Sequence, residues 1–207
     1  MPLAATGFAR LETFLDRIAS ETYPEPVSPL HDAITGDVME RALQLFNLPA
    51  GARVLDVGCG QGVALKRFVA RGFQPIGITL NATDVAVCQA AGYDVRQMDQ
   101  SFLDFDEGQF DLVWCRHCLE HSIFPYFTLD GFRQVLTPGG CLYVEVPAPD
   151  TACRHQTNGN HYSVLGRSML GSLILRSGFE IVDTLEVNFG TEAGPDTYWG
   201  FIARLPA

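Results

Sequence analysis

The sequence predicts an α/β protein built on a mostly parallel sheet. Residues 53–57 form an almost continuous apolar run, as expected of a central parallel strand that helices cover on both faces. A glycine-rich turn follows this run directly, and apolar residues then recur at helical spacing from Val63 to Val69. Further predicted strands alternate with predicted helices along the rest of the chain. These three observations favour an open sheet flanked by helices.

Composition is consistent with one well-filled domain. The chain has 207 residues, of which 47% are hydrophobic, and its mean hydropathy is +0.09. Apolar runs are too short for a membrane helix, and the first residues lack the features of a secretory signal, so a cytoplasmic protein is expected. The formal charge of −10 disfavours a nucleic-acid substrate and favours a small molecule or a substrate tethered to another protein. Oligomeric state stays open.

Six cysteines are spread along the chain, mostly in apolar surroundings. We expect them to behave as small buried hydrophobes rather than as a disulfide framework or a zinc knuckle. They are Cys59, Cys88, Cys115, Cys118, Cys141 and Cys153.

The glycine-rich turn begins at a carboxylate. Asp56 interrupts the apolar run near its carboxyl end, where a carboxylate needs a partner and where open α/β sheets bind their ligands. The glycines that follow let the backbone turn sharply and let a ligand approach it. A phosphate-binding loop would end in Gly-Lys-Ser/Thr, and a dinucleotide fingerprint would have glycine at Val63 and an acid where the next strand ends, at Thr79. Neither pattern fits.

The segment Asp56–Gly62, Asp-Val-Gly-Cys-Gly-Gln-Gly, resembles the first motif of class I S-adenosylmethionine (AdoMet) methyltransferases, D/E-x-G-x-G-x-G. The resemblance extends over about residues 50–205. It implies a seven-stranded, mostly parallel, doubly wound sheet that ends in an antiparallel hairpin, residues 179–188 and 197–205. It also implies that Asp56, Gly58, Gly60 and Gly62 hold the amino-acid end of the cofactor. The plain alternative is a helix start that needs glycine only for packing.

The second predicted strand, residues 73–78, departs from the common pattern of this family. Many members end this strand with an acid that binds the ribose hydroxyls, whereas this chain has Thr79-Leu80-Asn81. The segment is similar to the Gly-x-Thr-Leu-Ser variant of cyclopropane-fatty-acid synthases and some related methyltransferases. That resemblance implies that Thr79, Leu80, Asn81 and Asp84 surround the ribose. Asn81 and Asp84 also suit a helix N-cap and its N3 partner, and both interpretations can hold.

A third predicted strand, residues 93–97, precedes the position where the family binds adenine. By resemblance, Asp99 would bind the adenine amino group, and Gln100 and Ser101 would bind the ring edge. The alternative for Asp99 is a solvated acid in a turn.

The predicted strand 110–115 leads into His117-Cys118-Leu119-Glu120-His121. Taken alone, this is the H-x-x-E-H pattern of inverted zinc proteases, which needs a helix carrying both histidines and a third ligand elsewhere. The family commonly has H-x-L-E-H after this strand, so no metal site is predicted. Cys115 and His117 are expected to line the cofactor and substrate pocket. Glu120 and His121 suit a structural role as well as a catalytic one.

The remaining elements frame the predicted site. Helices are expected at residues 8–20, 36–47, 124–136 and 165–177, with an extended crossing at 23–29 and a strand at 141–146. Glu145 should lie near the ligand crevice, because it is close to the carboxyl end of its strand. The loop after that strand, residues 147–160, and the residues that follow are where the family forms its acceptor pocket. Residues 51–207 are the predicted AdoMet-binding domain.

The first 50 residues are expected to form a helical extension on that domain. The extension is either a packing layer on the sheet or a lid over the ligand site. In a lid, His31 would face the substrate.

The predicted function is AdoMet-dependent methyl transfer to a small-molecule acceptor. His117, His155 and His161 are the candidate general bases, because histidine titrates near neutral pH, and Tyr162 is a candidate for orienting the acceptor. Two alternatives remain: a different AdoMet-fold enzyme of the cyclopropane-forming type, which needs a long apolar groove, and a non-catalytic AdoMet-binding protein. A nicotinamide oxidoreductase is disfavoured by Val63 and Thr79.

Overall fold

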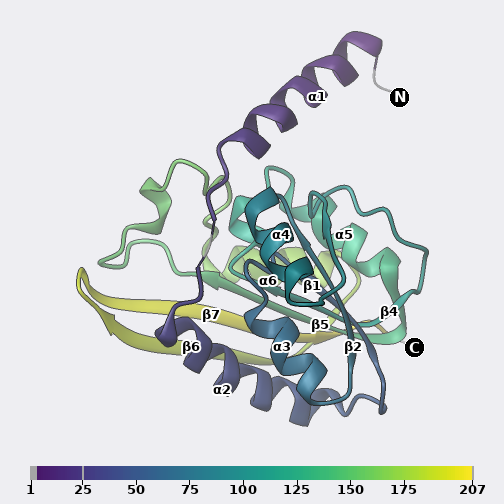
Figure 1. The fold of residues 1–207 in the computed structure, drawn as a ribbon. Coiled ribbons are helices and arrows are strands. Elements are labelled where there is room, and N and C mark those ends of the chain that lie inside the picture. Colours follow the sequence, from purple (N-terminus) through teal and green to yellow (C-terminus); the bar gives the residue numbers. More distant parts are fainter. Residues whose placement is uncertain (1–3, 25, 207) are drawn as a thin grey trace.

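The computed structural model describes residues 4–24 and 26–206 and contains a single seven-stranded sheet in that part of the chain (Figure 1). The strand order is β3-β2-β1-β4-β5-β7-β6. The strands are β1 Arg53–Val57, β2 Gln74–Thr79, β3 Val95–Gln97, β4 Phe110–Arg116, β5 Leu136–Pro147, β6 Glu180–Thr191 and β7 Gly194–Arg204.

Strand direction follows the prediction. The pairs β1–β2, β1–β4, β2–β3 and β4–β5 are parallel, and β7 is antiparallel to both β5 and β6. The sheet is therefore mostly parallel and ends in an antiparallel hairpin, so the expected fold class is confirmed. The chain order reverses between β1 and β4, which is where open α/β sheets bind ligands at the carboxyl ends of their strands.

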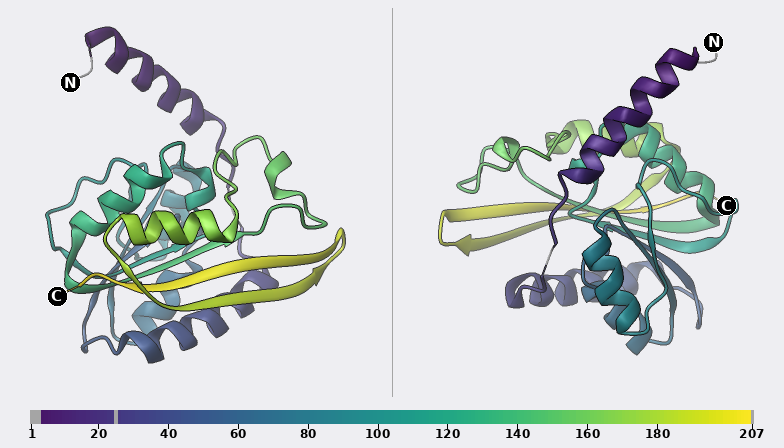
Figure 2. Two further views of the ribbon diagram at one scale, coloured as in Figure 1. Left: turned by 180° about the vertical axis from the view of Figure 1, so that it is seen from behind. Right: turned by 45° about the horizontal axis from the view of Figure 1, so that its top comes forward.

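Helices cover both faces of the sheet (Figure 2). The helices are α1 Ala5–Ser20, α2 Pro29–Phe46, α3 Val63–Ala70, α4 Ala82–Ala90, α5 Pro125–Val135 and α6 Arg167–Arg176, and two short 3-10 helices are η1 Leu119–His121 and η2 His155–Thr157. Buried residues of α2 and α3 form one apolar cluster with the sheet, and those of α5 and α6 form another on the opposite face.

The central strand β4 shows how the sequence fills both clusters. Leu112 and Trp114 belong to the α2 and α3 side, whereas Val113 and Cys115 belong to the α5 and α6 side. All four side chains are fully buried. Trp114 stacks on Tyr143 of β5 with 4.1 Å between ring centroids. Burial of each large side chain stabilises the fold by about 1.5–3 kcal/mol, and this core holds the strand ends in place.

Helix α2 begins seven residues before its predicted start at residue 36. Ser28 caps it by accepting a hydrogen bond from the His31 amide, and Pro29 occupies the first turn, where proline loses no helical hydrogen bond. The prolines that precede this turn were correctly expected to exclude a helix. Because α2 starts earlier, His31 lies in the first turn of a helix that is packed against the sheet.

Helix α1 projects from the body of the molecule (Figures 1 and 2). Ile18, near its C-terminal end, is its buried residue. The first 50 residues therefore contain two different parts: α2 packs on the sheet, and α1 stands away from it.

Two further elements differ from their expected bounds. The strand predicted at 141–146 runs over Leu136–Pro147 in β5, so it includes the Thr137-Pro138-Gly139-Gly140 segment. The helix predicted at residues 165–177 is shorter and runs over Arg167–Arg176 in α6.

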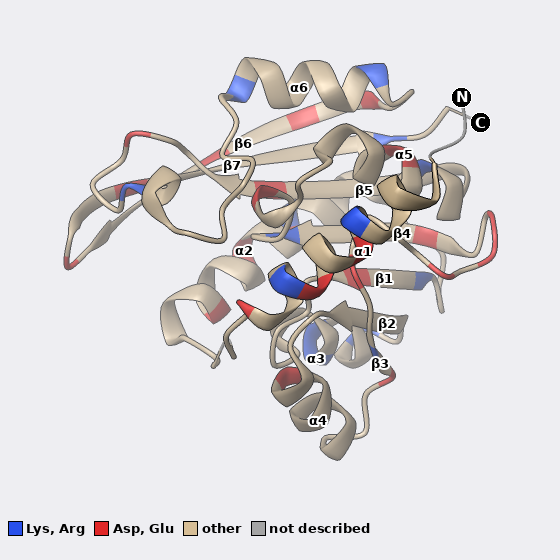
Figure 3. Ribbon diagram, turned by 90° about the horizontal axis from the view of Figure 1, so that it is seen from above, with Lys and Arg blue, Asp and Glu red and all other residues tan. Residues whose placement is uncertain are grey.

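Charge is distributed over the whole surface. Lys and Arg residues are scattered over several elements among a larger number of Asp and Glu residues (Figure 3). Within residues 4–24 and 26–206, the helices are too short or too polar to cross a bilayer.

Candidate functional site

Two neighbouring cavities open at the carboxyl ends of the parallel strands. The small cavity has a volume of about 100 Å³ and the large cavity about 420 Å³. The larger volume falls within the usual range of small-molecule pockets, about 300–1,000 Å³. The same five residues line both cavities, namely Tyr23, Gly58, Gly60, His117 and His121. The cavities therefore meet directly above the glycine turn.

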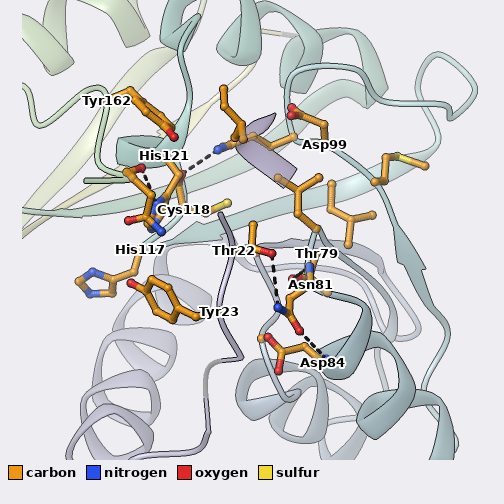
Figure 4. A pocket seen from close by; sticks show the side chains of 18 residues that line it. Thr22, Tyr23, Thr79, Asn81, Asp84, Asp99, His117, Cys118, His121 and Tyr162 are labelled. Atoms are coloured by element: carbon orange, nitrogen blue, oxygen red, sulfur yellow. Dashed lines mark hydrogen bonds between the residues drawn. The ribbon is translucent and has the colours of Figure 1, made fainter. Parts of the chain in front are cut away.

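The small cavity gathers most of the residues predicted to hold the nucleoside (Figure 4). Those that line it are Thr79, Leu80, Asn81, Asp84, Asp99 and Gln100. Asn81 is also the N-cap of α4, since its side-chain oxygen accepts hydrogen bonds from the amides of Thr83 and Asp84. The capping and lining interpretations of Asn81 therefore hold together.

The N-terminal segment crosses the mouth of the small cavity. Ile18, Thr22 and Tyr23 line it, and the Asn81 side-chain amide donates a hydrogen bond to the Thr22 hydroxyl (Figure 4). On the opposite rim, the Tyr162 hydroxyl donates to the Glu21 carboxylate over 3.3 Å. Residues 18–23 thus touch both rims of the cavity.

The glycine turn needs its glycines for two physical reasons. Gly58, Gly60 and Gly62 have φ of 72°, 48° and 86°, a left-handed region that side chains disfavour. A Cβ at Gly58 would lie 2.6 Å from the side chain of Cys118. Gly62 lines neither cavity and packs instead against Cys88 and Tyr93 at the start of α3. Gly62 shapes the loop as the N-cap residue of α3, and its contact with the cofactor stays a prediction.

Asp56 is a buried carboxylate on the wall of the large cavity. Its Oδ2 atom has no hydrogen-bond partner, and burial raises the pKa of Asp56 to about 8. A cationic group, such as the ammonium of an amino acid, would satisfy this oxygen and stabilise the ionised form. The turn and the carboxylate together therefore fit the amino-acid end of AdoMet.

Two predicted contacts are wrong in their placement. Cys115 is fully buried in the apolar core and lines neither cavity, because side chains alternate along β4 and the residue points toward α5 and α6. Ser101 is buried in a hydroxyl cluster with Ser122 and Thr128, and its amide already donates to the Asp99 carboxylate. Cys115 and Cys118 also have the C-x-x-C spacing, which the general argument about the cysteines overlooked.

All five histidines of the chain line the large cavity. They come from three separate parts of the sequence: His31 from α2, His117 and His121 from the segment after β4, and His155 and His161 from the loop after β5. The predicted bases are therefore brought together. His31, weighed only as part of a lid, joins them from a helix packed on the sheet.

His117 lies at the junction of the two cavities between two carboxylates. Its Nε2 atom is 3.0 Å from Glu145 Oε1, and its Nδ1 atom is 3.6 Å from Glu120 Oε1. Burial lowers the pKa of His117, but the two carboxylates outweigh burial and hold it above its usual value. A histidine that keeps its proton is a poor general base. Its φ of 52° is a left-handed conformation, which marks a constrained position.

Arg116 and Glu145 form an ion pair beneath this histidine. Arg116 Nε lies 2.7 Å from Glu145 Oε1, and the two side chains are 10% and 0% exposed. The geometry does not satisfy a hydrogen bond, so Nε and Nη2 of Arg116 are buried without a hydrogen-bond partner. Glu145 also accepts a hydrogen bond from the Tyr143 hydroxyl. Glu145 was expected near the crevice, whereas Arg116 was not singled out, although its place directly after a buried strand could have signalled it.

His155 is paired with a carboxylate on the far strand β7. Its Nε2 atom lies 2.8 Å from Oδ2 of Asp196, which is 3% exposed and also accepts from the Thr197 amide. Asp196 was missed in the sequence, because only the pairing of β5 with β7 brings it beside the loop after β5. Tyr198, two residues later, was missed for the same reason; its hydroxyl is 3.2 Å from His31 Nε2.

His31 and His161 are neutral at pH 7. Burial is the main cause, and nearby positive charge adds to it, so that the pKa of each falls to about 4. Each ring therefore carries a lone pair into the large cavity at neutral pH.

A family model described as a methyltransferase domain matches residues 31–184. This is well over half of the chain. The chain belongs to this methyltransferase family. The match includes the glycine turn and the carboxyl ends of the parallel strands that line the two cavities. It also includes the loop that carries His155 and His161.

Curated relatives of this methyltransferase include ubiquinone biosynthesis O-methyltransferases. That of Dechloromonas aromatica is 31% identical over 125 residues, 56% of this chain and 52% of its own length. That of Xanthomonas oryzae pv. oryzae is 35% identical over 128 residues, 58% and 52% of the two chains. The chain thus spans about half the length of these relatives.

Solved structures show the same fold. A SAM-dependent methyltransferase from Methanosarcina mazei has a TM-score of 0.68 at 15% identity, covering 88% of this chain and 99% of that one. The [4+2]-cyclase SpnF has a TM-score of 0.70 at 22% identity, covering 85% and 82%. The fold, its AdoMet cofactor and its class I type are therefore those expected from the glycine motif. The cyclase shows that the fold alone does not fix the reaction.

Proposed function

We propose that this methyltransferase transfers a methyl group from AdoMet to a hydroxyl oxygen of a small organic acceptor. The observation that carries the proposal is the meeting of the two cavities at Gly58, Gly60 and His117. One cavity has the residues to hold a nucleoside, and the other has the volume and polar groups to hold an acceptor. The name O-methyltransferase of the curated relatives supports oxygen as the methylated atom.

The chain's own residues divide the work of binding the cofactor. Asp99 and Gln100 would hold the base, Asn81 and Asp84 the ribose, and Asp56 with the glycine turn the amino-acid end. When bound there, the cofactor supplies an electrophilic methyl group on a sulfonium. The protein orients the reacting groups and excludes water, and orientation alone supplies up to about 7–11 kcal/mol of the barrier.

His155 is the base that the geometry favours. With its Nε2 atom bound to the buried Asp196, the imidazole has a fixed orientation and Nδ1 is the atom left to take a proton. Asp196 would stabilise the imidazolium that forms. His117 is less suited to this role, because its two carboxylates raise its pKa.

Residues 18–24 would act as a lid over the cofactor, and residues 51–207 as the AdoMet-binding domain. The hydrogen bonds of Thr22 to Asn81 and of Tyr162 to Glu21 support this division. Helix α2 would be the packing layer of the N-terminal extension, since its apolar face belongs to the core. We also propose a cytoplasmic location and no nucleic-acid partner, on the basis of charge and composition.

Cyclopropane formation is disfavoured by the lining of the large cavity. That chemistry needs a long apolar groove, whereas the cavity has five histidines, Arg116 and Glu120 on its wall. A purely binding role is disfavoured by the intact glycine turn and by the His155–Asp196 pair at an acceptor-sized cavity.

The test is a transfer assay with AdoMet and matched small phenols, amines and thiols. Mass spectrometry would follow both the demethylated cofactor and the methylated acceptor. We expect isothermal titration to detect AdoMet binding and the assay to detect transfer to hydroxyl acceptors. Absence of AdoMet binding by folded protein, or transfer confined to amines or thiols, would contradict the proposal.

A further inference from the structure

Glu120, His121 and His161 form a cluster on the wall of the large cavity that the proposed methyl transfer does not use. Each offers one metal-ligating atom, and these three atoms lie within 4.8 Å of one another. Glu120 and His121 belong to η1 after β4, and His161 comes from the loop after β5, 40 residues further along the chain. All three line the same cavity.

Two of these residues hold buried acceptor atoms without partners. Glu120 is 1% exposed, and its Oε2 atom has no hydrogen-bond partner; its other oxygen faces His117. The Nδ1 atom of His161 is likewise buried and without a partner. Buried polar atoms are nearly always bonded, so two unsatisfied acceptors at one point need an explanation. A cation between them would satisfy both.

The backbone engages the other nitrogen of His121. Its Nδ1 atom is 2.9 Å from the Asn160 carbonyl, which only accepts, so Nδ1 carries the proton and Nε2 keeps its lone pair. Metal-ligating histidines are oriented in this way, with one nitrogen on a backbone carbonyl and the other presented to the ion. The centroid of the His161 ring is 4.6 Å from that of His121 and 6.0 Å from that of His155.

Three hydrogen bonds clamp the two ligand-bearing segments together. The Ser163 amide donates to the Glu120 carbonyl over 2.8 Å, and the Ser163 hydroxyl donates to the Ser122 carbonyl over 2.6 Å. The His121–Asn160 bond is the third. His161 is therefore held opposite Glu120 and His121 by the backbone itself, so the cluster is preorganised rather than a chance approach of mobile side chains.

We propose that Glu120 Oε2, His121 Nε2 and His161 Nδ1 bind one divalent transition-metal ion such as Zn²⁺. Two imidazole nitrogens and one carboxylate oxygen are a ligand set that this class of ion prefers, and three protein ligands leave a position open toward the cavity. No metal site was expected, because the family's H-x-L-E-H motif accounts for the H-x-x-E-H pattern, in which both histidines would be ligands. Here His117 is engaged by Glu145, and His161 takes its place.

The role of the ion, unlike its binding, rests on the proposed function. A hydroxyl oxygen of the acceptor would occupy the open position and become more acidic there. As the metal–oxygen bond strengthens, the O–H bond breaks and the proton passes to His155, which lines the same cavity.

The test measures metal binding without cofactor or acceptor. Protein treated with a chelator and then dialysed is titrated with Co²⁺, followed by visible absorption, and with Zn²⁺ by calorimetry. We expect one equivalent of each ion to bind. Glu120→Gln and His161→Ala should each weaken metal binding by at least about 10–100-fold. Loss of a residue that only hydrogen-bonds a metal ligand already weakens metal affinity by about that factor.

Two matched variants serve as controls. His31→Ala removes a histidine of the same cavity that lies outside the cluster and should leave metal binding unchanged. Cys153→Ser tests the neighbouring group Cys153, His155 and Asp196, in which His155 and Asp196 are already bonded to each other. The Cys153→Ser variant should also bind the metal ion as tightly as the unmodified protein.

Circular dichroism establishes that each variant is folded. If Glu120→Gln does not fold, the milder Glu120→Asp replaces it, and a Zn²⁺-dependent rise in the melting temperature of the unmodified protein provides a second readout. The proposal is overturned if the unmodified protein binds no ion, or if Glu120→Gln and His161→Ala bind as tightly as it does. A protein that binds the ion but methylates nothing contradicts the proposed function alone.

Discussion

His117 Nε2 lies 3.0 Å from Oε1 of Glu145, a carboxylate with no exposed surface, and this contact holds the histidine where the two cavities meet. Burial raises the pKa of Glu145, but His117 and Arg116 outweigh it and hold that pKa below its usual value. Both shifts favour an ion pair at the junction. A raised pKa makes His117 less suited to act as a base at neutral pH.

Glu145→Gln should free His117 to titrate lower. We expect the pKa of His117 to fall and the protein to lose about 3–5 kcal/mol of stability, because Arg116 and His117 lose a buried partner. Proton NMR titration and urea unfolding measure the two effects. An unchanged pKa would show that Glu120 alone sets the charge of His117.

The same pair predicts how stability depends on pH. A raised histidine pKa stabilises the fold fully below about pH 6.5, and the contribution is lost as pH rises through the folded value. A lowered Glu145 pKa stabilises above about pH 4.5, and that contribution is lost as pH falls through the folded value. Urea unfolding between pH 4.5 and 9 should show a decline toward alkaline pH that is smaller in Glu145→Gln.

Asp56→Asn should stabilise the ligand-free protein at alkaline pH and weaken AdoMet binding. Because burial raises the pKa of Asp56 to about 8, stability is greatest below about pH 4, where the carboxyl group is protonated in both the folded and the unfolded state, and it falls as pH rises through 8. An amide has no charge to bury. Thermal unfolding at pH 9 and calorimetry with AdoMet measure the two effects.

The cofactor's ammonium should also draw a proton from Asp56. Calorimetry at pH 7 in buffers of different ionisation enthalpy should detect proton release on AdoMet binding by the unmodified protein and less release by Asp56→Asn. Equal proton release by both proteins would place the ammonium elsewhere.

Gly60→Val should abolish AdoMet binding, because a branched side chain would enter both cavities at their junction. Its φ of 48° adds backbone strain, so a control must share that strain. Gly92→Val is such a control, since Gly92 has φ of 86° and open space around it at the end of α4. Calorimetry on both variants should detect binding by the control only.

His155→Ala and Asp196→Asn should lower the rate of methyl transfer by about 10²–10⁴-fold while leaving AdoMet affinity within a small factor. Both variants act on one unit, so the double variant should be little worse than His155→Ala. Steady-state kinetics and calorimetry separate the effects. A parallel loss of affinity would indicate that the pair only supports the loop.

Sequence alone determined the parallel sheet, the glycine turn and many of the residues that line the small cavity. These features are local: an apolar run predicts a strand, and three glycines predict a turn that a ligand can approach. The motif also determined the family and the cofactor. The start of α2 was misplaced, because an N-cap at Ser28 was read as part of a proline-rich crossing.

Only the tertiary structure decided what the polar residues do. Pairing of β5 with β7 brings Asp196 and Tyr198 to the large cavity, and backbone hydrogen bonds between two distant segments place His161 beside Glu120. Side-chain alternation sends Cys115 into the core. The pKa values of His31, His117 and His161 depend on burial and on charged groups that the fold brings near them, and no local pattern contains that information because strand pairing and packing create it.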